Sequence, residues 1–171
     1  MIAEPPEILT LDRMPTPIGE ALVVTDAAGV LRAFNWRDYE ASMMGWIVRR
    51  HPRAFVEEGR GPLRAPVDAY FSGDIAALRT IPWRGAGTPF QQSVWAALCT
   101  IPDGETLSYA GLAARIGRPT AVRAVGLANG SNPVSLVVPC HRVIGSDGSL
   151  TGYGGGLERK RWLLAHERAW P

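Results

Sequence analysis

The sequence contains very little cysteine and histidine, the residues that build disulfide frameworks and most metal sites. Only two cysteines occur among the 171 residues, Cys99 and Cys140, and the segments around them are unrelated. We therefore expect two free thiols and no disulfide. The chain before Cys99 holds a single histidine, His51, so no structural zinc is expected there. His51 itself is interpreted as a helix-end or surface residue.

Long apolar runs are also absent. No run approaches the roughly 18 residues that a membrane-spanning helix requires, and the opening segment MIAEPPEILTLDRMP has no basic stretch followed by an apolar one. The sequence thus predicts a cytoplasmic protein without a membrane partner. Because 46% of the residues are hydrophobic, the chain can fill a core of ordinary size. We expect a monomer without an obligate protein partner.

The net charge of +2 is small, but it is unevenly distributed. Residues 1–87 hold 10 Arg and 11 Asp or Glu, whereas residues 88–171 hold 8 Lys or Arg and 5 Asp or Glu. This excess of positive charge is a weak indication of a polyanionic partner for the second half. By itself it does not distinguish a nucleic-acid-binding domain from an ordinary one.

A segment rich in proline and glycine, PWRGAGTP at 82–89, divides the chain near its middle. It predicts an N-terminal α/β domain at 1–84 and a C-terminal domain at 85–171. The expected fold class is α/β, with a small N-terminal antiparallel sheet and helices followed by a mainly helical part.

In the first part, β-branched and aromatic residues at 18–25 and 30–36 predict two strands joined by a turn. Such strands form an antiparallel hairpin. Helical spacing of apolar residues predicts helices at 38–51 and 66–72. None of these segments contains a group of side chains typical of a catalytic site.

The second part is more regular. Apolar residues from Phe90 to Ile101 recur at helical spacing behind a Thr88-Pro89 start, where proline is well tolerated. Ser108 is expected to cap a short helix that stops at Gly117, and another helix is expected at 120–130. Two short helices joined by a turn form a helix-turn-helix pattern, which many DNA-binding proteins use. An ordinary pair of packed helices gives the same pattern.

The helix at 120–130 is expected to bury Val122 and Val125 and to offer small side chains elsewhere. The small residues are Ala121, Ala124, Gly126 and Ala128. A thin helix can approach DNA closely, and Arg123 can then reach the base stack. The alternative is a helix packed tightly on its neighbour, with Arg123 in solvent.

Cys140 follows the apolar run VSLVVP and precedes His141 and Arg142. A lone cysteine in such a run is usually a small inert hydrophobic residue, as we expect of Cys99. Cys140 differs because the adjacent histidine and a later glutamate can supply the base and the orienting group that a thiolate nucleophile needs.

Two long segments closely resemble one known family. PCHRVIGSDGSLTGYGGGLERKRWLLAHE resembles the active-site region of the 6-O-alkylguanine-DNA alkyltransferases, the methylated-DNA–protein-cysteine methyltransferases. PFQQSVWAALCTIPDGETLSYAGLAARIGRPTAVRAVGLANGSNPV is similar to the family's helix-turn-helix, and TPIGEALVVTDAAGVLRAF is more loosely similar to its N-terminal sheet. The resemblance implies a ribonuclease-H-like N-terminal domain.

The resemblance also implies the chemistry. Cys140 would accept the alkyl group, His141 would deprotonate the thiol through a water, and Glu167 would hold the imidazole. Tyr109 would help guanine to leave, and Asn132 would support the active-site turn. No cofactor is implied, and transfer to a thioether would be irreversible and single-turnover.

The implied partner is double-stranded DNA that contains alkylated guanine. A damaged base has to rotate out of the helix to be reached, and Arg123 would fill the gap while Tyr109 crowds the phosphate. The small residues of the same helix that would face DNA are Ala124, Gly126 and Ala128.

The expected substrate pocket is formed by four further positions. The Val143 carbonyl would recognise the edge of guanine, and Tyr153 and Gly154 would line the pocket. Some relatives carry serine at the position of Gly154, which leaves the hydrogen bonding to the guanine oxygen open here. Ser135 lies close enough to influence which alkyl groups fit.

Two other functions are compatible with parts of the sequence. A Cys-His hydrolase can use Cys140 and His141, but no oxyanion-hole pattern accompanies them. A non-catalytic sensor of alkylated DNA can share the fold, but such sensors lack the acceptor cysteine. The basic residues at 159–161 are interpreted as a solvated helix face, and His166 as a packing or capping residue.

Overall fold

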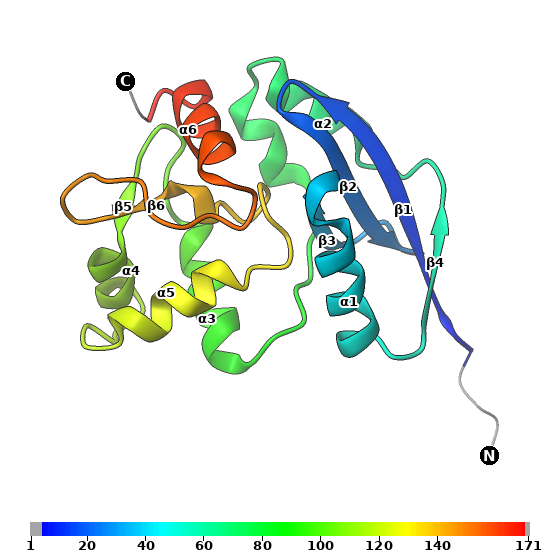
Figure 1. Ribbon diagram of the computed structural model, residues 1–171, viewed down its shortest axis with the longest axis horizontal. Coiled ribbons are helices and arrows are strands. Elements are labelled where there is room, and N and C mark those ends of the chain that lie inside the picture. Colours follow the sequence, from blue (N-terminus) through cyan, green and yellow to red (C-terminus); the bar gives the residue numbers. More distant parts are fainter. Residues whose placement is uncertain (1–4, 170–171) are drawn as a thin grey trace.

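The computed structural model describes residues 5–169 and contains the predicted α/β architecture (Figure 1). In chain order the elements are β1 (Glu7–Thr16), β2 (Gly19–Asp26), β3 (Leu31–Trp36), the 3-10 helix η1 (Arg37–Tyr39), α1 (Glu40–Arg50), β4 (Ala54–Glu58), α2 (Arg64–Phe71), η2 (Ile75–Thr80), α3 (Pro89–Leu98), β5 (Leu107–Ser108), α4 (Tyr109–Arg115), α5 (Val122–Gly130), η3 (Cys140–Arg142), β6 (Val143–Ile144) and α6 (Leu157–His166). Among the described residues, no helix is both long and apolar enough to cross a membrane.

The N-terminal sheet has the strand order β3-β2-β1-β4. The predicted hairpin is confirmed as β2 and β3, which pair antiparallel, and the Asp26 carboxylate accepts hydrogen bonds from the Ala28 and Val30 amides of the turn. Strands β1 and β4 were not expected. β4 pairs parallel to β1 at the edge of the sheet, so the sheet is mixed rather than purely antiparallel. A parallel partner needs a crossover, and α1 supplies it.

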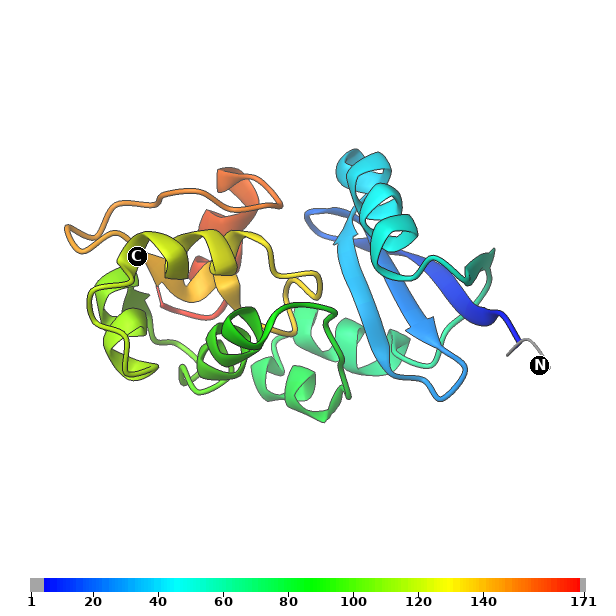
Figure 2. The ribbon, with the colours of Figure 1, turned by 90° about the horizontal axis from the view of Figure 1, so that it is seen from below.

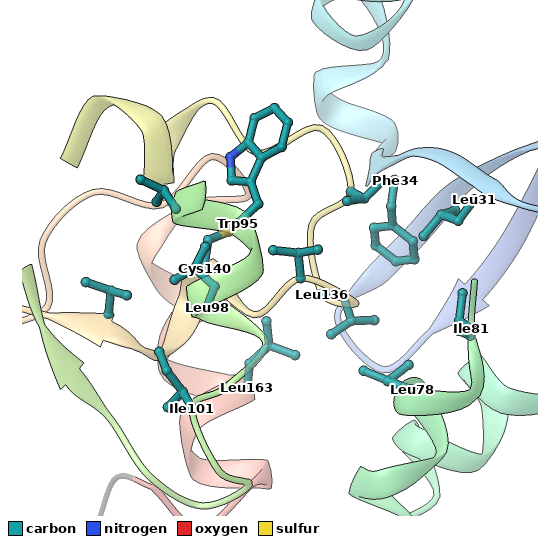
Figure 3. Packing of buried hydrophobic residues seen from close by; sticks show 14 of the residues in the cluster. Leu31, Phe34, Leu78, Ile81, Trp95, Leu98, Ile101, Leu136, Cys140 and Leu163 are labelled. Carbon is teal, nitrogen blue, oxygen red and sulfur yellow. The ribbon is translucent and has the colours of Figure 1, made fainter. Parts of the chain in front are cut away.

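Two apolar clusters cover the two faces of this sheet. α1 packs one face through Met43 and Ile47, against Leu22 and Val24 of β2. The other face belongs to a larger cluster that continues into the C-terminal half. Figure 3 shows Phe34 and Ile81 from the N-terminal half in the same cluster as residues of the C-terminal half.

Backbone hydrogen bonds also join the two halves. The Leu31 amide donates to the Pro82 carbonyl at 2.8 Å, the Arg84 amide donates to the Leu31 carbonyl at 2.9 Å, and the Phe34 amide donates to the Pro133 carbonyl at 2.9 Å. The connecting segment therefore runs along the free edge of β3. Figure 2 shows the two halves side by side, with α4 and α5 far from the sheet. The division into domains at residue 84 stays a prediction.

The predicted helix-turn-helix is present as α4 and α5. The Ser108 side chain caps α4 by accepting from the Gly111 amide, and Gly117, with φ of 73°, follows the helix end as expected. Upstream, Thr88 and Gln91 form a capping box for α3. Trp95 of α3 donates from its indole nitrogen to the Ala128 carbonyl at 2.9 Å, which attaches α3 to α5.

This attachment can be measured through protein stability. Trp95→Phe removes part of a buried ring and the indole donor, so we expect the free energy of unfolding to fall by about 2 kcal/mol. Urea unfolding monitored by circular dichroism measures the change. The matched substitution Trp46→Phe at a half-buried position should cost less than about 1 kcal/mol. Equal losses at both positions would contradict the structural role of Trp95.

Candidate active site

The turn between α5 and η3 is held by one side chain. The Asn132 amide group donates to the Val138 carbonyl at 2.8 Å, and its oxygen accepts from the Val134 amide at 3.0 Å. Leu136 in this turn has φ of 71°, a conformation that costs a residue with a side chain about 1–2 kcal/mol. Asn132 therefore stabilises a strained turn whose end presents Cys140, which agrees with its predicted supporting role.

Cys140 lies in the wall of a cavity of about 320 Å³. Cys140 is only 4% exposed and belongs to the larger apolar cluster, yet it also lines this cavity. The cavity is also lined by the predicted residues Tyr109, Gly126, Asn132, Ser135, Tyr153 and Gly154, and by Asn35, Tyr39, Ser42, Asn129, Gly130 and Gly152. The structure thus brings together seven of the predicted site residues at one cavity.

The environment of the thiol favours its protonated form at rest. Burial raises the pKa of Cys140, while interactions with Asn132 and Ser135 and the charge of Lys160 act in the opposite direction. Because the thiolate is the reactive form, this thiol depends on a neighbouring base to become a nucleophile.

His141, the residue after Cys140, forms a buried pair with Glu167 from the end of α6. The Nε2 atom of His141 lies 2.8 Å from Oε1 of Glu167, and both side chains are fully buried. The other ring nitrogen, Nδ1, has no hydrogen-bond partner among the described residues. The geometry therefore holds the imidazole by one nitrogen and leaves the second available to accept a proton.

Arg142 completes the surroundings of the carboxylate. Its Nε donates to Oε2 of Glu167 at 2.8 Å, and its other nitrogens donate to the Ile101 carbonyl at 2.9 Å and to Asp103 at 3.2 Å. Burial alone would raise the pKa of Glu167, but the His141 and Arg142 contacts bring it well below its usual range. Glu167 is therefore ionised.

The solvated-face prediction for the start of α6 is wrong for Lys160. This residue is 0% exposed, and its ammonium donates to the carbonyls of Val143 at 2.6 Å, Thr151 at 2.7 Å and Gly152 at 3.4 Å. Burial lowers its pKa to about 8, and the nearby Cys140 opposes this shift. Lys160 thus fastens the loop of residues 151–152 to β6.

The prediction of a solvated helix face is also wrong for Arg159, which is half-buried, whereas Arg161 is exposed. The Arg159 guanidinium donates to the Ile18 carbonyl at 2.9 Å and to Asp38 at 2.8 Å. It also lies 4.8 Å from the centre of the Trp36 ring. Arg159 therefore joins α6 to the N-terminal sheet.

Of the residues predicted to form the substrate pocket, some line the cavity and one is buried. Tyr153 and Gly154 lie in the cavity wall, as predicted, and the neighbouring Gly155 packs so closely that an added Cβ would lie 2.7 Å from atoms of Trp36 and Tyr153. Val143 has a fully buried side chain, and its carbonyl accepts from Lys160. Recognition of guanine by that carbonyl stays a prediction.

Helix α5 presents part of the predicted DNA-facing surface. Arg123 and Ala124 are exposed and Gly126 is half-buried. Ala128 is only 3% exposed and lies in the core, so the prediction that it faces DNA is wrong, because α5 turns this position toward Trp95 of α3.

Two larger apolar residues of α5 face outward. Val122, which was expected to be buried, is exposed, and Leu127 is 72% exposed. Tyr109, at the start of α4, is half-buried, and its hydroxyl accepts from Thr151 at 3.1 Å. The exposed face of α5 therefore carries larger apolar side chains than the sequence analysis predicted.

Part of the N-terminal half lies at this cavity, which the sequence analysis did not predict. Asn35, Tyr39 and Ser42, from β3, η1 and α1, form one of its walls. Asn129 is buried, and its amide group donates to the Cys140 carbonyl at 3.4 Å. Asn35, Tyr39 and Ser42 are far from Cys140 in the chain, and no local motif marks their place at the cavity.

The chain is similar to proteins of one family. Residues 89–169 match the family model described as 6-O-methylguanine DNA methyltransferase, DNA binding domain. Over 160 residues, 91% of this chain and 94% of the relative, it is 44% identical to the methylated-DNA–protein-cysteine methyltransferase of Shigella flexneri. The crystal structure of Mycobacterium tuberculosis O6-methylguanine methyltransferase matches with a TM-score of 0.76 and 40% identity, over 95% of this chain and 94% of that one. The M. tuberculosis OGT structure in complex with DNA matches with a TM-score of 0.77 and 39% identity, over 94% and 93%.

The buried ammonium gives a prediction about pH. Because the pKa of Lys160 is lowered from 10.5 to about 8, the unfolded chain holds more protons between these values, and stability contributed by Lys160 rises as pH increases through this window. We expect the difference in free energy of unfolding between the wild type and Lys160→Met to shift in favour of the wild type from pH 8 to pH 10.5. Urea unfolding over this range measures it, and a constant difference would contradict the prediction.

Proposed function

The chain belongs to the family of the 6-O-methylguanine DNA methyltransferases, and we propose that the Cys140 sulfur is the atom that receives the alkyl group from damaged guanine. The protein is a DNA-binding methyltransferase of DNA repair. The observation that carries the assignment of Cys140 is its place in the cavity wall, directly before the histidine of a buried histidine–carboxylate pair in the chain.

The proposed transfer is a direct displacement. The Cys140 thiol gives its proton through a bridging water to Nδ1 of His141, and the resulting thiolate attacks the alkyl carbon. A sulfur–carbon bond forms as the carbon–oxygen bond to guanine breaks. The departing guanine oxygen takes up negative charge, and the Tyr109 hydroxyl at the cavity wall supplies the hydrogen bond or proton that stabilises it.

The roles of the remaining residues follow from their contacts. Glu167 fixes the imidazole through Nε2 and stabilises its positive charge once it has taken the proton. Asn132 holds the strained turn, and Ser135 and Tyr153 shape the space next to the sulfur. All these groups come from one chain, which supports action as a monomer.

Access to the cavity requires a rotated nucleotide. A base stacked in a duplex cannot bring its alkyl carbon to a buried sulfur, so the nucleotide has to leave the stack. Arg123 is exposed on α5, and Tyr109 of α4 and Gly126 of α5 line the cavity. We propose that α5 lies on the DNA, that Arg123 occupies the gap, and that exposed Leu127 adds an apolar contact in the groove.

The acceptor is tested by mass spectrometry of the intact protein. After incubation with methylguanine-containing duplex DNA, we expect one added methylene per molecule, located at Cys140 by peptide mapping. Cys140→Ser should show no mass change and should retain DNA binding, whereas Cys99→Ser should react like the wild type. An unchanged mass of the wild type would instead indicate a sensor that only binds the lesion, and turnover of a peptide substrate would indicate a hydrolase.

The arginine is tested by comparing two substrates. Arg123→Ala should slow transfer from duplex DNA by at least about tenfold, because the cost of unstacking is a few kcal/mol, and should leave the reaction with a free alkylguanine base within about twofold. Single-turnover rates on both substrates measure the difference. Arg60→Ala, an exposed arginine of the other half, is the matched control. Equal losses on both substrates would refute the proposed gap-filling role.

A further inference from the structure

The carboxylate of Glu167 has a third partner that comes from the N-terminal half of the protein. Tyr70 lies near the end of α2 and is fully buried. Its hydroxyl donates to Oε1 of Glu167 at 2.7 Å, across 97 positions of sequence. Its backbone carbonyl accepts from Nε2 of His166 at 2.7 Å. Figure 1 shows α2 and α6 next to each other in the upper part of the view.

Tyr70 and the catalytic histidine share one oxygen. Oε1 of Glu167 receives the Tyr70 hydroxyl at 2.7 Å and lies 2.8 Å from Nε2 of His141, while Oε2 receives Arg142. Burial raises the pKa of Tyr70 far above its usual value, and the Glu167 charge adds to this shift. The hydroxyl therefore keeps its proton and acts as a donor to the ionised carboxylate.

Three donors fix the rotation of this carboxylate. Arg142 and His141 both belong to η3, and of these two only His141 contacts Oε1 of Glu167. The Tyr70 hydroxyl approaches from α2, a separate element, and thereby restricts the carboxylate from a second direction. A buried carboxylate is stable only when its lone pairs are satisfied, so the third donor has both an energetic and a geometric effect.

The ring of Tyr70 is itself held in place. It makes edge contacts with the rings of Phe71 and His166, each with 5.1 Å between ring centres. Phe71 also packs on Trp162 of α6, with 5.8 Å between ring centres. The ring of Tyr70 is thus buried at the aromatic contact between α2 and α6, and its hydroxyl is oriented by the hydrogen bond to Glu167.

We propose that Tyr70 is a positioning residue for alkyl transfer: the N-terminal half orients Glu167 through this hydroxyl, and Glu167 in turn orients the His141 imidazole toward Cys140. This inference rests on the proposed function, since it concerns the base of the same reaction. The N-terminal half thereby contributes to the chemical step, in addition to forming one wall of the cavity.

The variant Tyr70→Phe keeps the ring and its packing and removes only the hydroxyl. We expect the single-turnover rate constant at saturating protein to fall about tenfold, as for loss of a hydrogen bond to a charged group. The reaction with a free alkylguanine base should fall by the same factor, and Kd for DNA should change less than about twofold. A loss confined to duplex DNA would overturn the proposal.

Phe71→Leu is the matched control. Phe71 packs in the same interface but gives no hydrogen bond to Glu167. It should lower Tm while leaving the transfer rate within about twofold. If both variants lose rate equally, Tyr70 acts only through packing and the proposal is overturned.

Proton NMR gives a readout that packing alone does not move. The His141 Nε2 proton, held by a carboxylate, should give a downfield imidazole resonance that shifts in Tyr70→Phe and stays in place in Phe71→Leu. Should Tyr70→Phe fail to fold, a slowly exchanging Tyr70 hydroxyl proton close to the His141 ring in the wild type supports the contact, and its absence overturns it. Absence of any transfer by the wild type would instead count against the proposed function.

Discussion

The buried carboxylate of Glu167 is the contact on which the rest of the site depends. It receives Arg142 and Tyr70 and pairs with His141. Removing one partner of a buried ion pair typically costs about 3–5 kcal/mol, because an uncompensated charge remains. The contacts that stabilise the negative charge of Glu167 therefore also fix the His141 imidazole. The stability of the fold and the position of the base depend on the same hydrogen bonds. Arg142 extends this network through Asp103 toward the start of the helix-turn-helix.

The second constraint is the turn that presents the sulfur. Its strain at Leu136 is compatible with a stable fold because Asn132 closes it from both sides and Leu136 is fully buried. Since the turn lies where the two halves meet, β3 and α1 contribute to the cavity wall. The loop that carries Tyr153 is fastened by Lys160. Strain, burial and charge thus all act to hold the Cys140 thiol at the wall of the cavity.

Much of this could be predicted from local sequence. The hairpin, the capped start of α3 and the Ser108 cap follow from short patterns that do not depend on the rest of the fold. Strand β4 could not be predicted, because its pairing with β1 is decided by the crossover through α1. The fold class and the family are confirmed, whereas the individual roles of the site residues stay predictions.

The errors at the site have a common origin in helix rotation and long-range contact. Lys160 stands between two arginines, which favours a solvated face, but the rotation of α6 turns it toward three carbonyl oxygens. Ala128 and Leu127 are neighbours in sequence, and the rotation of α5 buries the first and exposes the second. Tyr70 contacts Glu167 from a distant segment, for which local sequence has no signal.

The burial of the thiol agrees with the proposed transfer to a thioether at Cys140, a reaction that can occur only once per molecule. A thiolate that is always present reacts with oxidants and other electrophiles, and this would consume an acceptor that cannot be regenerated. Burial raises the pKa of Cys140 and keeps it protonated. The reactivity lost in this way is restored only where the base is already in place and an alkyl carbon enters the cavity. A stoichiometric acceptor therefore gains selectivity from the same burial that makes its thiol a poor nucleophile at rest.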